Sequence, residues 1–233
     1  MKRIILFALI ALLAVSCGRV KEEVVLTWPN GKPQLVNLYK EHKGQRTLVG
    51  EKMFYQNGQL RASKHFAGSN QQPDGQWQYF YPSGDLFAQG QFDAQHPLGA
   101  QWTFRTSKGK PFVDGAVDSV SVLELSELQI PSTVAFHQGD TASICQFFDN
   151  FDLRSQGMLS GNKRVGHWFF YYPGGTVQEE AVFIDGVQNG RFNVYRENGV
   201  PYYIGYYING QRAGIWEFYD EQGNLSGTKN FDR

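Results

Sequence analysis

Aromatic and β-branched residues alternate with polar residues on both sides of short turn signals along most of the chain. The clearest copies of this pattern are Gly75–Gly84, Gly166–Gly175, Gly190–Gly199 and Gly214–Gly223. In the last copy Trp216 and Phe218 share one face of an extended strand, because side chains alternate between faces. Turn signals such as Asn198-Gly199 are typical of tight connections between antiparallel strands. The pattern therefore predicts a repeated β-hairpin.

The turn glycines define a frame that can be tested at other positions. They are Gly31, Gly58, Gly84, Gly109, Gly175, Gly199 and Gly223, separated by 27, 26, 25, 66, 24 and 24 residues. Phe151 lies 24 residues before Gly175 and marks an eighth unit that has lost its glycine. The position seven residues before each anchor is apolar in seven of the eight units, with Glu51 as the exception. The position eight residues after it is apolar or aromatic in all eight.

A single hairpin is marginally stable in water, whereas stacked hairpins bury their aromatic positions jointly. We therefore expect an all-β fold, in which tandem β-hairpin repeats form an elongated, twisted antiparallel sheet. The repeats occupy residues 24–117 and 144–233. The segment 118–143 between them lacks the repeat, and we expect it to form one or two extra strands or a cap between two halves. A functional insertion is the alternative.

The repeat frame resembles a known family. The order Gly-x-Trp-x-x-Tyr-Tyr-x-x-Gly-x-Leu, followed by Asn-Gly-x-x-x-Gly, is similar to the bacterial MORN-repeat variant family, whose members are often described as resembling the YwqK antitoxin. The resemblance covers residues 24–117 and 142–233 and is strongest from Gly166 to Phe231. It implies a hairpin-repeat fold. It implies no single activity, because such repeats serve many tasks.

The N-terminus has the pattern of a targeting segment. Lys2 and Arg3 precede an apolar run, Ile4 to Val15, that is shorter than the about 20 residues a membrane-spanning helix needs. Residues 1–16 are therefore expected to be a secretory signal peptide. The end of the run, Leu13-Ala14-Val15-Ser16-Cys17, resembles the bacterial lipobox, although its leucine lies one position early. The resemblance implies cleavage before Cys17 and addition of acyl chains such as palmitate. The alternative is an ordinary secreted protein with a chance cysteine.

The residues after Cys17 are expected to form a tether, residues 17–23. The absence of Asp directly after the cysteine resembles lipoproteins sent to an outer membrane. Lys21-Glu22-Glu23 resembles the short signal of surface-exposed lipoproteins in the Bacteroidetes group. We therefore expect a protein that is lipid-anchored in the bacterial cell envelope, in the outer membrane and exposed at the cell surface.

The charge of the chain bears on its class of binding partner, and its cysteine content bears on disulfide formation. Without Lys2 and Arg3, the 22 basic side chains fall to 20 against 22 acidic ones, which argues against a nucleic-acid partner. Once Cys17 is acylated, Cys145 is the remaining cysteine and has no partner for an intramolecular disulfide. We expect Cys145 to be a buried apolar residue.

Motifs of catalysis are missing from the sequence. It contains no Gly-x-Ser-x-Gly elbow, no phosphate-binding Gly-x4-Gly-Lys-Ser/Thr loop and no His-Glu-x-x-His. Its five histidines are scattered over different units and are expected at the surface: His42, His65, His96, His137 and His167. Glu179 and Glu180 are neighbours on a strand and are expected on opposite faces, so they do not form an acid–base pair. We expect neither an enzyme nor a metal or cofactor site.

Aromatic density is the remaining functional signal. A candidate binding surface consists of Tyr171, Tyr172, Tyr195, Tyr202, Tyr203, Tyr206 and Tyr207. Their alternative role is cross-strand packing. The sequence predicts a membrane-anchored, non-catalytic repeat lipoprotein that acts as a protein-interaction or scaffold module, with another envelope protein or a glycan as partner. The alternatives are a carbohydrate-binding surface lipoprotein and an antitoxin- or immunity-like protein. An enzyme using residues 118–143 would lack a convergent set of polar residues.

Overall fold

The computed structural model describes residues 20–68, 70–113 and 115–232. Its strands form two antiparallel sheets. The first has eight strands: β1 (Val20–Thr27), β2 (Pro33–His42), β3 (Gln45–Phe54), β4 (Leu60–Ala67), β5 (Gln72–Pro73), β6 (Gly75–Phe80), β7 (Leu86–Asp93) and β8 (His96–Phe104). The second has ten: β9 (Ser119–Leu125), β10 (Pro131–Gln138), β11 (Thr141–Phe147), β12 (Leu153–Ser160), β13 (Lys163–Tyr171), β14 (Val177–Ile184), β15 (Val187–Tyr195), β16 (Pro201–Ile208), β17 (Gln211–Tyr219) and β18 (Leu225–Asn230).

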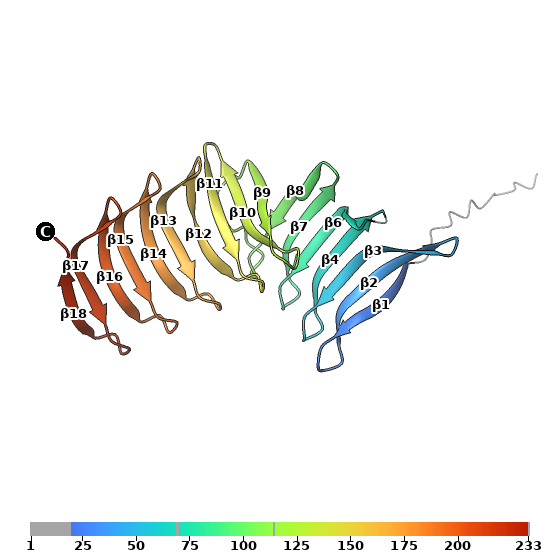
Figure 1. Ribbon diagram of the computed structural model, residues 1–233, viewed down its shortest axis with the longest axis horizontal. Helices are drawn as coiled ribbons and strands as arrows, with labels where there is room; N and C mark the ends of the chain where they lie inside the picture. Colours follow the sequence, from blue (N-terminus) through green and yellow to red (C-terminus); the bar gives the residue numbers. More distant parts are fainter. Residues whose placement is uncertain (1–19, 69, 114, 233) are drawn as a thin grey trace, which may run out of the picture.

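The strands follow one another in chain order across the long axis of an elongated molecule (Figure 1). The short strand β5 pairs with β4 outside this order. No helix occurs in the part of the chain that the structure describes. The expected fold of tandem β-hairpins in a twisted antiparallel array is thus confirmed, with the array divided into two sheets that meet between β8 and β9.

One turn geometry recurs nine times within the described ranges. In the first copy the amide of Trp28 donates to the carbonyl of Lys32, and the amide of Gly31 donates back to the carbonyl of Trp28. The fourth residue of every copy has a positive φ, which a β-carbon disfavours. Glycine holds this position in seven copies, while Phe151 (φ 71°) and Gln129 (φ 57°) hold it in the other two. Phe151 therefore keeps the turn without its glycine, as the repeat frame predicts.

Residues 118–143 form a shortened ninth hairpin. Strands β9 and β10 are joined by the same turn, at Ser126–Ile130, with Gln129 in the glycine position. The two strands agree with the expectation of one or two extra strands in this segment, whereas the recurrence of the turn corrects the expectation that the segment lacks the repeat. The frame missed it because Gln129 lies 20 residues after Gly109 and 22 before Phe151, rather than 24 to 27.

The two sheets separate where one strand is missing. After β8 the chain makes its turn at Thr106–Lys110, and no second strand follows among the described residues before β9. The ladder therefore stops at β8, and the second sheet is free to pack against the first.

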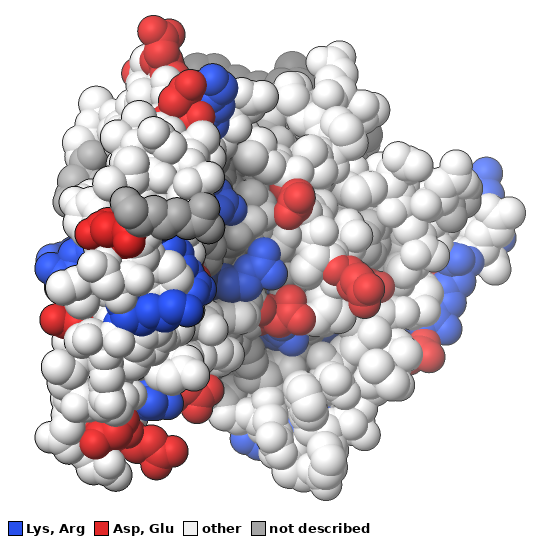
Figure 2. Space-filling model, turned by 60° about the vertical axis from the view of Figure 1, so that its left-hand side comes forward, with Lys and Arg blue, Asp and Glu red and all other residues white. Residues whose placement is uncertain are grey.

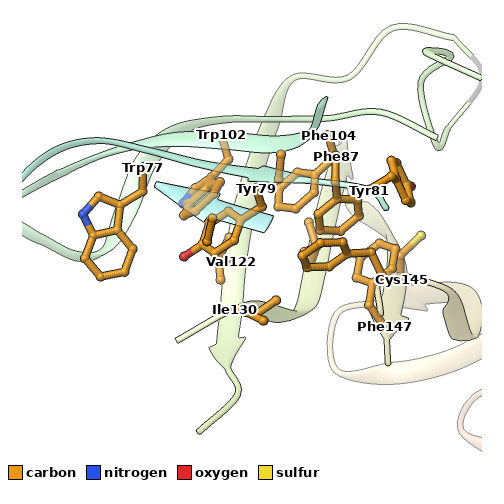
Figure 3. Packing of buried hydrophobic residues seen from close by; sticks show 14 of the residues in the cluster. Trp77, Tyr79, Tyr81, Phe87, Trp102, Phe104, Val122, Ile130, Cys145 and Phe147 are labelled. Carbon is orange, nitrogen blue, oxygen red and sulfur yellow. The ribbon is translucent and has the colours of Figure 1, made fainter. Parts of the chain in front are cut away.

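The main core lies between the two sheets. Trp102 and Phe104 from the first sheet belong to the same buried cluster as Cys145 and Phe147 from the second. At its centre Phe87 stacks on Phe151, with ring centroids 4.4 Å apart and an interplanar angle of 13°. Figure 3 shows the rings of the first sheet pointing toward Val122, Ile130 and Phe147. Large buried side chains of this kind each contribute about 1.5–3 kcal/mol, so this contact holds the two sheets together.

Hydrogen bonds from the first sheet to two turns of the second add to this contact. The Tyr79 hydroxyl donates to the carbonyl of Gln129 (2.5 Å). The Lys64 ammonium donates to the carbonyl of Leu128 (2.8 Å), and Arg61 donates to that of Asp149 (2.8 Å). Because Tyr79 and Lys64 are buried, these bonds satisfy polar groups that burial would otherwise penalise.

Within each sheet, tryptophans lie over glycines of the preceding hairpin. The pairs are Gly90 with Trp102, Gly157 with Trp168 and Gly205 with Trp216, and a β-carbon on these glycines would come within 2.4, 2.1 and 2.2 Å of the indole. In two other repeats a smaller side chain takes the place of the tryptophan and alanine takes the place of the glycine. These pairs are Phe192 with Ala181 and Ile144 with Ala135. The size of one residue therefore matches the space that its cross-strand neighbour leaves.

The first strand begins earlier than expected. Strand β1 starts at Val20 and includes Lys21, Glu22 and Glu23, which were expected in a tether. Lys21 forms an ion pair with Glu41 (2.7 Å), Glu22 with Lys52 (2.7 Å), and Glu23 with Arg46. This corrects the expectation that Lys21, Glu22 and Glu23 belong to a tether. The expected signal peptide, residues 1–16, and the expected lipidation site Cys17 lie outside the described residues.

Candidate functional site

One face of the second sheet is covered by the first sheet at β9–β11 and is more open further along. A row of cross-strand partners crosses this face in the order Val134, Cys145, Gln156, Phe169, Glu180, Asn193, Ile204 and Glu217. Val134 and Cys145 lie in the buried cluster shared by the two sheets. From Phe169 to Glu217 the row is partly exposed, apart from Asn193. We call this part of the surface, over β13–β17, the open face.

A hydrogen-bonded group lies at the centre of the open face. Asn193 is only 6% exposed; its Nδ2 donates to Glu180 Oε2 (2.6 Å), and its Oδ1 accepts from Arg191 Nε (3.0 Å). The Tyr195 hydroxyl also donates to Glu180 Oε2, at 3.4 Å. Because Asn193 uses both ends of its amide, it holds the orientations of the carboxylate and the guanidinium.

Two tyrosines of the open face are kept protonated by their surroundings. Burial raises the pKa of Tyr195, and the nearby Glu180 carboxylate raises it further. Burial also raises the pKa of Tyr171, against the opposing effect of a hydrogen bond from Gln156 Nε2 (2.6 Å). Both hydroxyls therefore remain neutral hydrogen-bonding groups at physiological pH.

Large apolar side chains of the same strands and of β16 and β17 are exposed to solvent. They are Ile184 (59% exposed), Val187 (45%), Tyr202 (47%), Tyr206 (50%), Ile208 (54%) and Ile215 (62%). Ile184 lies four residues after Glu180 on β14, and Tyr206 pairs with Arg191, two residues before Asn193 on β15, so strand alternation places these side chains on the open face. Exposed apolar surface with tyrosine and arginine at its centre is typical of protein interaction sites.

The seven candidate tyrosines do not form a single surface. Tyr202 and Tyr206 are exposed on the open face, and Tyr171 and Tyr195 are half-buried on it. Tyr203 and Tyr207 lie on the opposite face, where both pack against Trp216 and Phe192. This division follows the alternation of side chains along β16.

Tyr172, the seventh, lies in a turn and connects two hairpins. Its hydroxyl donates to the carbonyl of Tyr195 in the next hairpin (3.1 Å). The same position and bond recur in Tyr55 to Phe80 (2.8 Å), and Arg196 donates likewise to Tyr219 (2.9 Å). Tyr172 therefore has a structural contact that holds neighbouring hairpins in place.

The sequence did not single out several residues of the open face. Arg191, Asn193 and the exposed isoleucines are isolated in sequence and match no motif. Glu180 was noted only as the neighbour of Glu179, and the two do lie on opposite faces, since Glu180 pairs with Phe169 and Glu179 with Phe170. The period-two alternation of β14–β17, applied strand by strand, is the signal that could have grouped them.

A cavity of about 390 Å³ adjoins the open face at β11–β13. Its lining includes Phe112, Val113, Met158, His167 and Phe169, with Cys145 at its base. Cys145 is 2% exposed, and burial raises the pKa of its thiol to about 12, so the thiol is protonated and unreactive. The expectation of a buried apolar cysteine is confirmed.

Four of the five histidines, which were expected at the surface, are exposed. His42, His65, His96 and His167 are exposed, whereas His137 is half-buried, with Nε2 3.2 Å from Ser121 Oγ. Within the described ranges, no group of three or more His, Cys, Asp or Glu side chains is arranged to hold a metal ion. The same residues contain no helix long and apolar enough to cross a membrane.

Charges do not gather into a patch of one sign on the side of the molecule drawn in Figure 2. Basic and acidic side chains are interspersed there, with uncharged surface between them.

Comparison with family models finds the MORN repeat variant at residues 73–94, 164–185 and 212–233. Each match corresponds to one hairpin, β6–β7, β13–β14 or β17–β18, and the last two begin one residue after the start of β13 and β17. The three matches of 22 residues together cover 66 of the 233 residues. The match identifies the repeated unit that the sequence pattern and the structure show.

No curated protein matches the chain. Among solved structures, one similarity is to a mutant of S. aureus TarM in complex with Fondaparinux, alpha-GlcNAc-glycerol and UDP (12% identity, TM-score 0.29, 38% of this chain and 18% of that one). Another is to a GtfA/B complex (14% identity, TM-score 0.32, 47% of this chain and 21% of that one). The chain thus matches about a fifth of the length of these structures, at TM-scores too low to support an argument about function.

Proposed function

We propose that this chain is a bacterial envelope lipoprotein whose hairpin repeats form a non-catalytic module that binds another envelope protein through the open face. The observation that carries the proposal is the group of Glu180, Arg191 and Asn193 on the same face as exposed isoleucine and tyrosine side chains. A preorganised polar centre supplies specificity, and the apolar rim supplies buried area.

The lipobox-like sequence at Cys17 supports the envelope location. Cys17 precedes the first residue of β1 by three positions, so acyl chains on this cysteine would hold the N-terminal end of the array at a membrane. The open face lies toward the opposite end, at β13–β17 (Figure 1). We propose that the array projects this face away from an outer membrane, toward a partner at the cell surface.

The alternatives have less support. Carbohydrate binding by a strip of exposed tryptophan and tyrosine is disfavoured, because Trp77, Trp102, Trp168 and Trp216 are all buried. An antitoxin or immunity role would require a toxin as the bound protein, and no feature of the open face selects one. A catalytic role would require polar side chains that converge on a substrate. The polar side chains of the open face bond to one another instead, since Asn193 holds the Glu180 carboxylate and the Arg191 guanidinium in place.

The anchoring is tested by expressing the full chain in a Gram-negative bacterium and determining the mass of its N-terminal peptide. We expect diacylglycerol and a further acyl chain on Cys17, and release of the Cys17→Ala variant from the membrane. An unmodified cysteine, or a variant that is processed and membrane-bound like the wild type, would contradict the lipoprotein assignment.

The interaction is tested by chemical crosslinking in intact cells, followed by purification of the full chain. Tyr206→Asp with Ile215→Asp introduces charge into the open face, and Leu98→Asp makes the same change at an exposed residue (43%) of the first sheet. We expect the double variant to lose a crosslinked envelope protein that Leu98→Asp retains. Equal recovery with both variants would exclude the open face as the binding surface.

A further inference from the structure

The junction between the first and second hairpins lacks the pair of glycine and tryptophan that fills space at three later junctions. In the repeat frame Asn37 occupies the position of Gly205, and Glu51 occupies that of Trp216. Asn37 and Glu51 are cross-strand partners on β2 and β3. Where other hairpins place an indole, this one has a polar cavity of about 430 Å³, a size typical of small-ligand sites.

The lining of the polar cavity is rich in hydrogen-bonding groups. It includes Asn37, Tyr39, Arg46, Thr47, Leu48 and Glu51. Asn37 Nδ2 donates to the Tyr39 hydroxyl (3.1 Å), while Asn37 Oδ1 is buried and accepts no hydrogen bond. A buried acceptor without a donor is costly and is commonly satisfied by a water or a ligand.

Arg46 forms part of the wall above Tyr39. Its guanidinium lies 3.6 Å from the centroid of the Tyr39 ring and is paired with Glu23. The side chain of Arg46 is 45% exposed, so it can move with little cost in buried contacts. It can therefore donate to a group in the cavity and uncover the tyrosine ring.

We propose that the polar cavity binds a neutral, polyhydroxylated ligand, such as one sugar residue of a glycan. Asn37 Oδ1 and the Glu51 carboxylate require donors, which disfavours an anion. The guanidinium of Arg46 in the same wall disfavours a cation. A hydroxyl group both donates and accepts, so neighbouring sugar hydroxyls can donate to Asn37 or Glu51 and accept from Arg46. The apolar face of the sugar would contact Leu48 and Tyr39.

This site belongs to the first sheet and is independent of the open face. Its test uses the full chain in detergent and saturation-transfer NMR with glucose, galactose, mannose and N-acetylglucosamine. Glycerol phosphate and arginine methyl ester serve as anionic and cationic probes. We expect saturation transfer to at least one neutral sugar and none to the two charged probes.

Two variants separate a ligand site from a polar space that holds only water. Glu51→Gln keeps the shape but removes the charge, and it should weaken binding of that sugar about tenfold. The combination of Asn37→Gly and Glu51→Trp restores the pair used elsewhere in the repeat, fills the cavity and should abolish binding. Glu217→Gln, on the other sheet, is the matched control and should bind like the wild type.

Some outcomes would overturn the proposal. Absence of saturation transfer from the wild type to any of the four sugars would show a cavity that holds water only. Unchanged binding in both Glu51 variants, or preferred binding of a charged probe, would place the sugar elsewhere or change the class of ligand. If the double variant failed to fold, Glu51→Gln would still decide the result, because it preserves the size of the side chain.

Discussion

The indole of Trp216 lies flat against Gly205 of the adjacent strand, where a β-carbon would come within 2.2 Å of the ring. The same relationship joins Trp168 to Gly157. Each tryptophan thus covers the backbone of the preceding hairpin, and this contact couples one repeat to the next. The stability of the array therefore depends on glycines in the middle of strands as well as on those in turns.

Gly205→Ala should destabilise the protein by about 2 kcal/mol, because overpacking a filled site typically costs 1–3 kcal/mol. The measurement is urea unfolding followed by tryptophan fluorescence. Gly227→Ala is the control: it changes a strand glycine that has no atom within 4 Å of its added β-carbon. An equal effect of the two substitutions would show that the indole does not need the space at Gly205.

The pair formed by Ala181 and Phe192 tests whether size matching is general. Phe192→Trp alone should be destabilising, since Ala181 retains the methyl group that the tryptophan sites lack. Adding Ala181→Gly should recover at least about 1 kcal/mol, which a double-mutant cycle measures as coupling. Purely additive effects of the two substitutions would contradict the matching rule.

Gln129→Gly should stabilise the protein by about 1 kcal/mol. Gln129 is exposed and has a φ of 57°, a conformation that costs a residue with a β-carbon about 1–2 kcal/mol. Tyr79 bonds only to its backbone carbonyl, so this contact survives the change. Phe151→Gly should instead be strongly destabilising in thermal unfolding, because Phe151 stacks on Phe87 in the core. Stabilisation by both substitutions would contradict this account of the core.

Much of the fold follows from local patterns. Turn glycines such as Gly199, together with the alternation around Trp216, predict the hairpins and their order, because these signals depend only on neighbouring residues. The hairpin containing Gln129 was missed since its turn lacks glycine and its spacing is shorter. The packing of Phe87 on Phe151 was not predicted, because it depends on the absence of a second strand after Thr106–Lys110 among the described residues.

The open face was predicted only in part. Tyr202 and Tyr206 were included, but Tyr203 and Tyr207 were grouped with them although strand alternation places them on the other face. Arg191 and Asn193 were missed, because the group that they form depends on the cross-strand pairing of Asn193 with Glu180. Such partners depend on register and bulges, which the order of residues along one strand does not specify.

The buried Lys64 predicts a dependence of stability on pH. Burial lowers the pKa of its ammonium to about 8, from an ordinary value of 10.5, against the opposing effect of Glu51. Between these values Lys64 keeps its proton in the unfolded chain and loses it in the folded one, so the contribution of Lys64 to the free energy of unfolding should rise with pH in this interval. From pH 7.5 to 9.5 the gain should be on the order of 1–2 kcal/mol.

Comparison with Lys64→Met isolates this contribution in urea unfolding at the two pH values. The difference in free energy of unfolding between wild type and variant should grow by this amount, since methionine carries no proton to lose. The difference is the quantity to compare because other buried groups act in the opposite sense in both proteins: burial raises the pKa of the Cys145 thiol to about 12 and that of Tyr79 well above its ordinary value, so loss of these protons favours the unfolded chain. A difference that stays constant from pH 7.5 to 9.5 would contradict this account of Lys64.

Site-specific photocrosslinking in intact cells tests the proposed interaction most directly. A photoreactive phenylalanine analogue would replace Tyr206 on the open face or Leu98 on the first sheet, which are 50% and 43% exposed. We predict a discrete adduct with one envelope protein from position 206, none from position 98, and loss of the adduct in Cys17→Ala. Adducts of equal yield and pattern from both positions, or none from position 206, would contradict the claim that the open face binds a partner at the envelope.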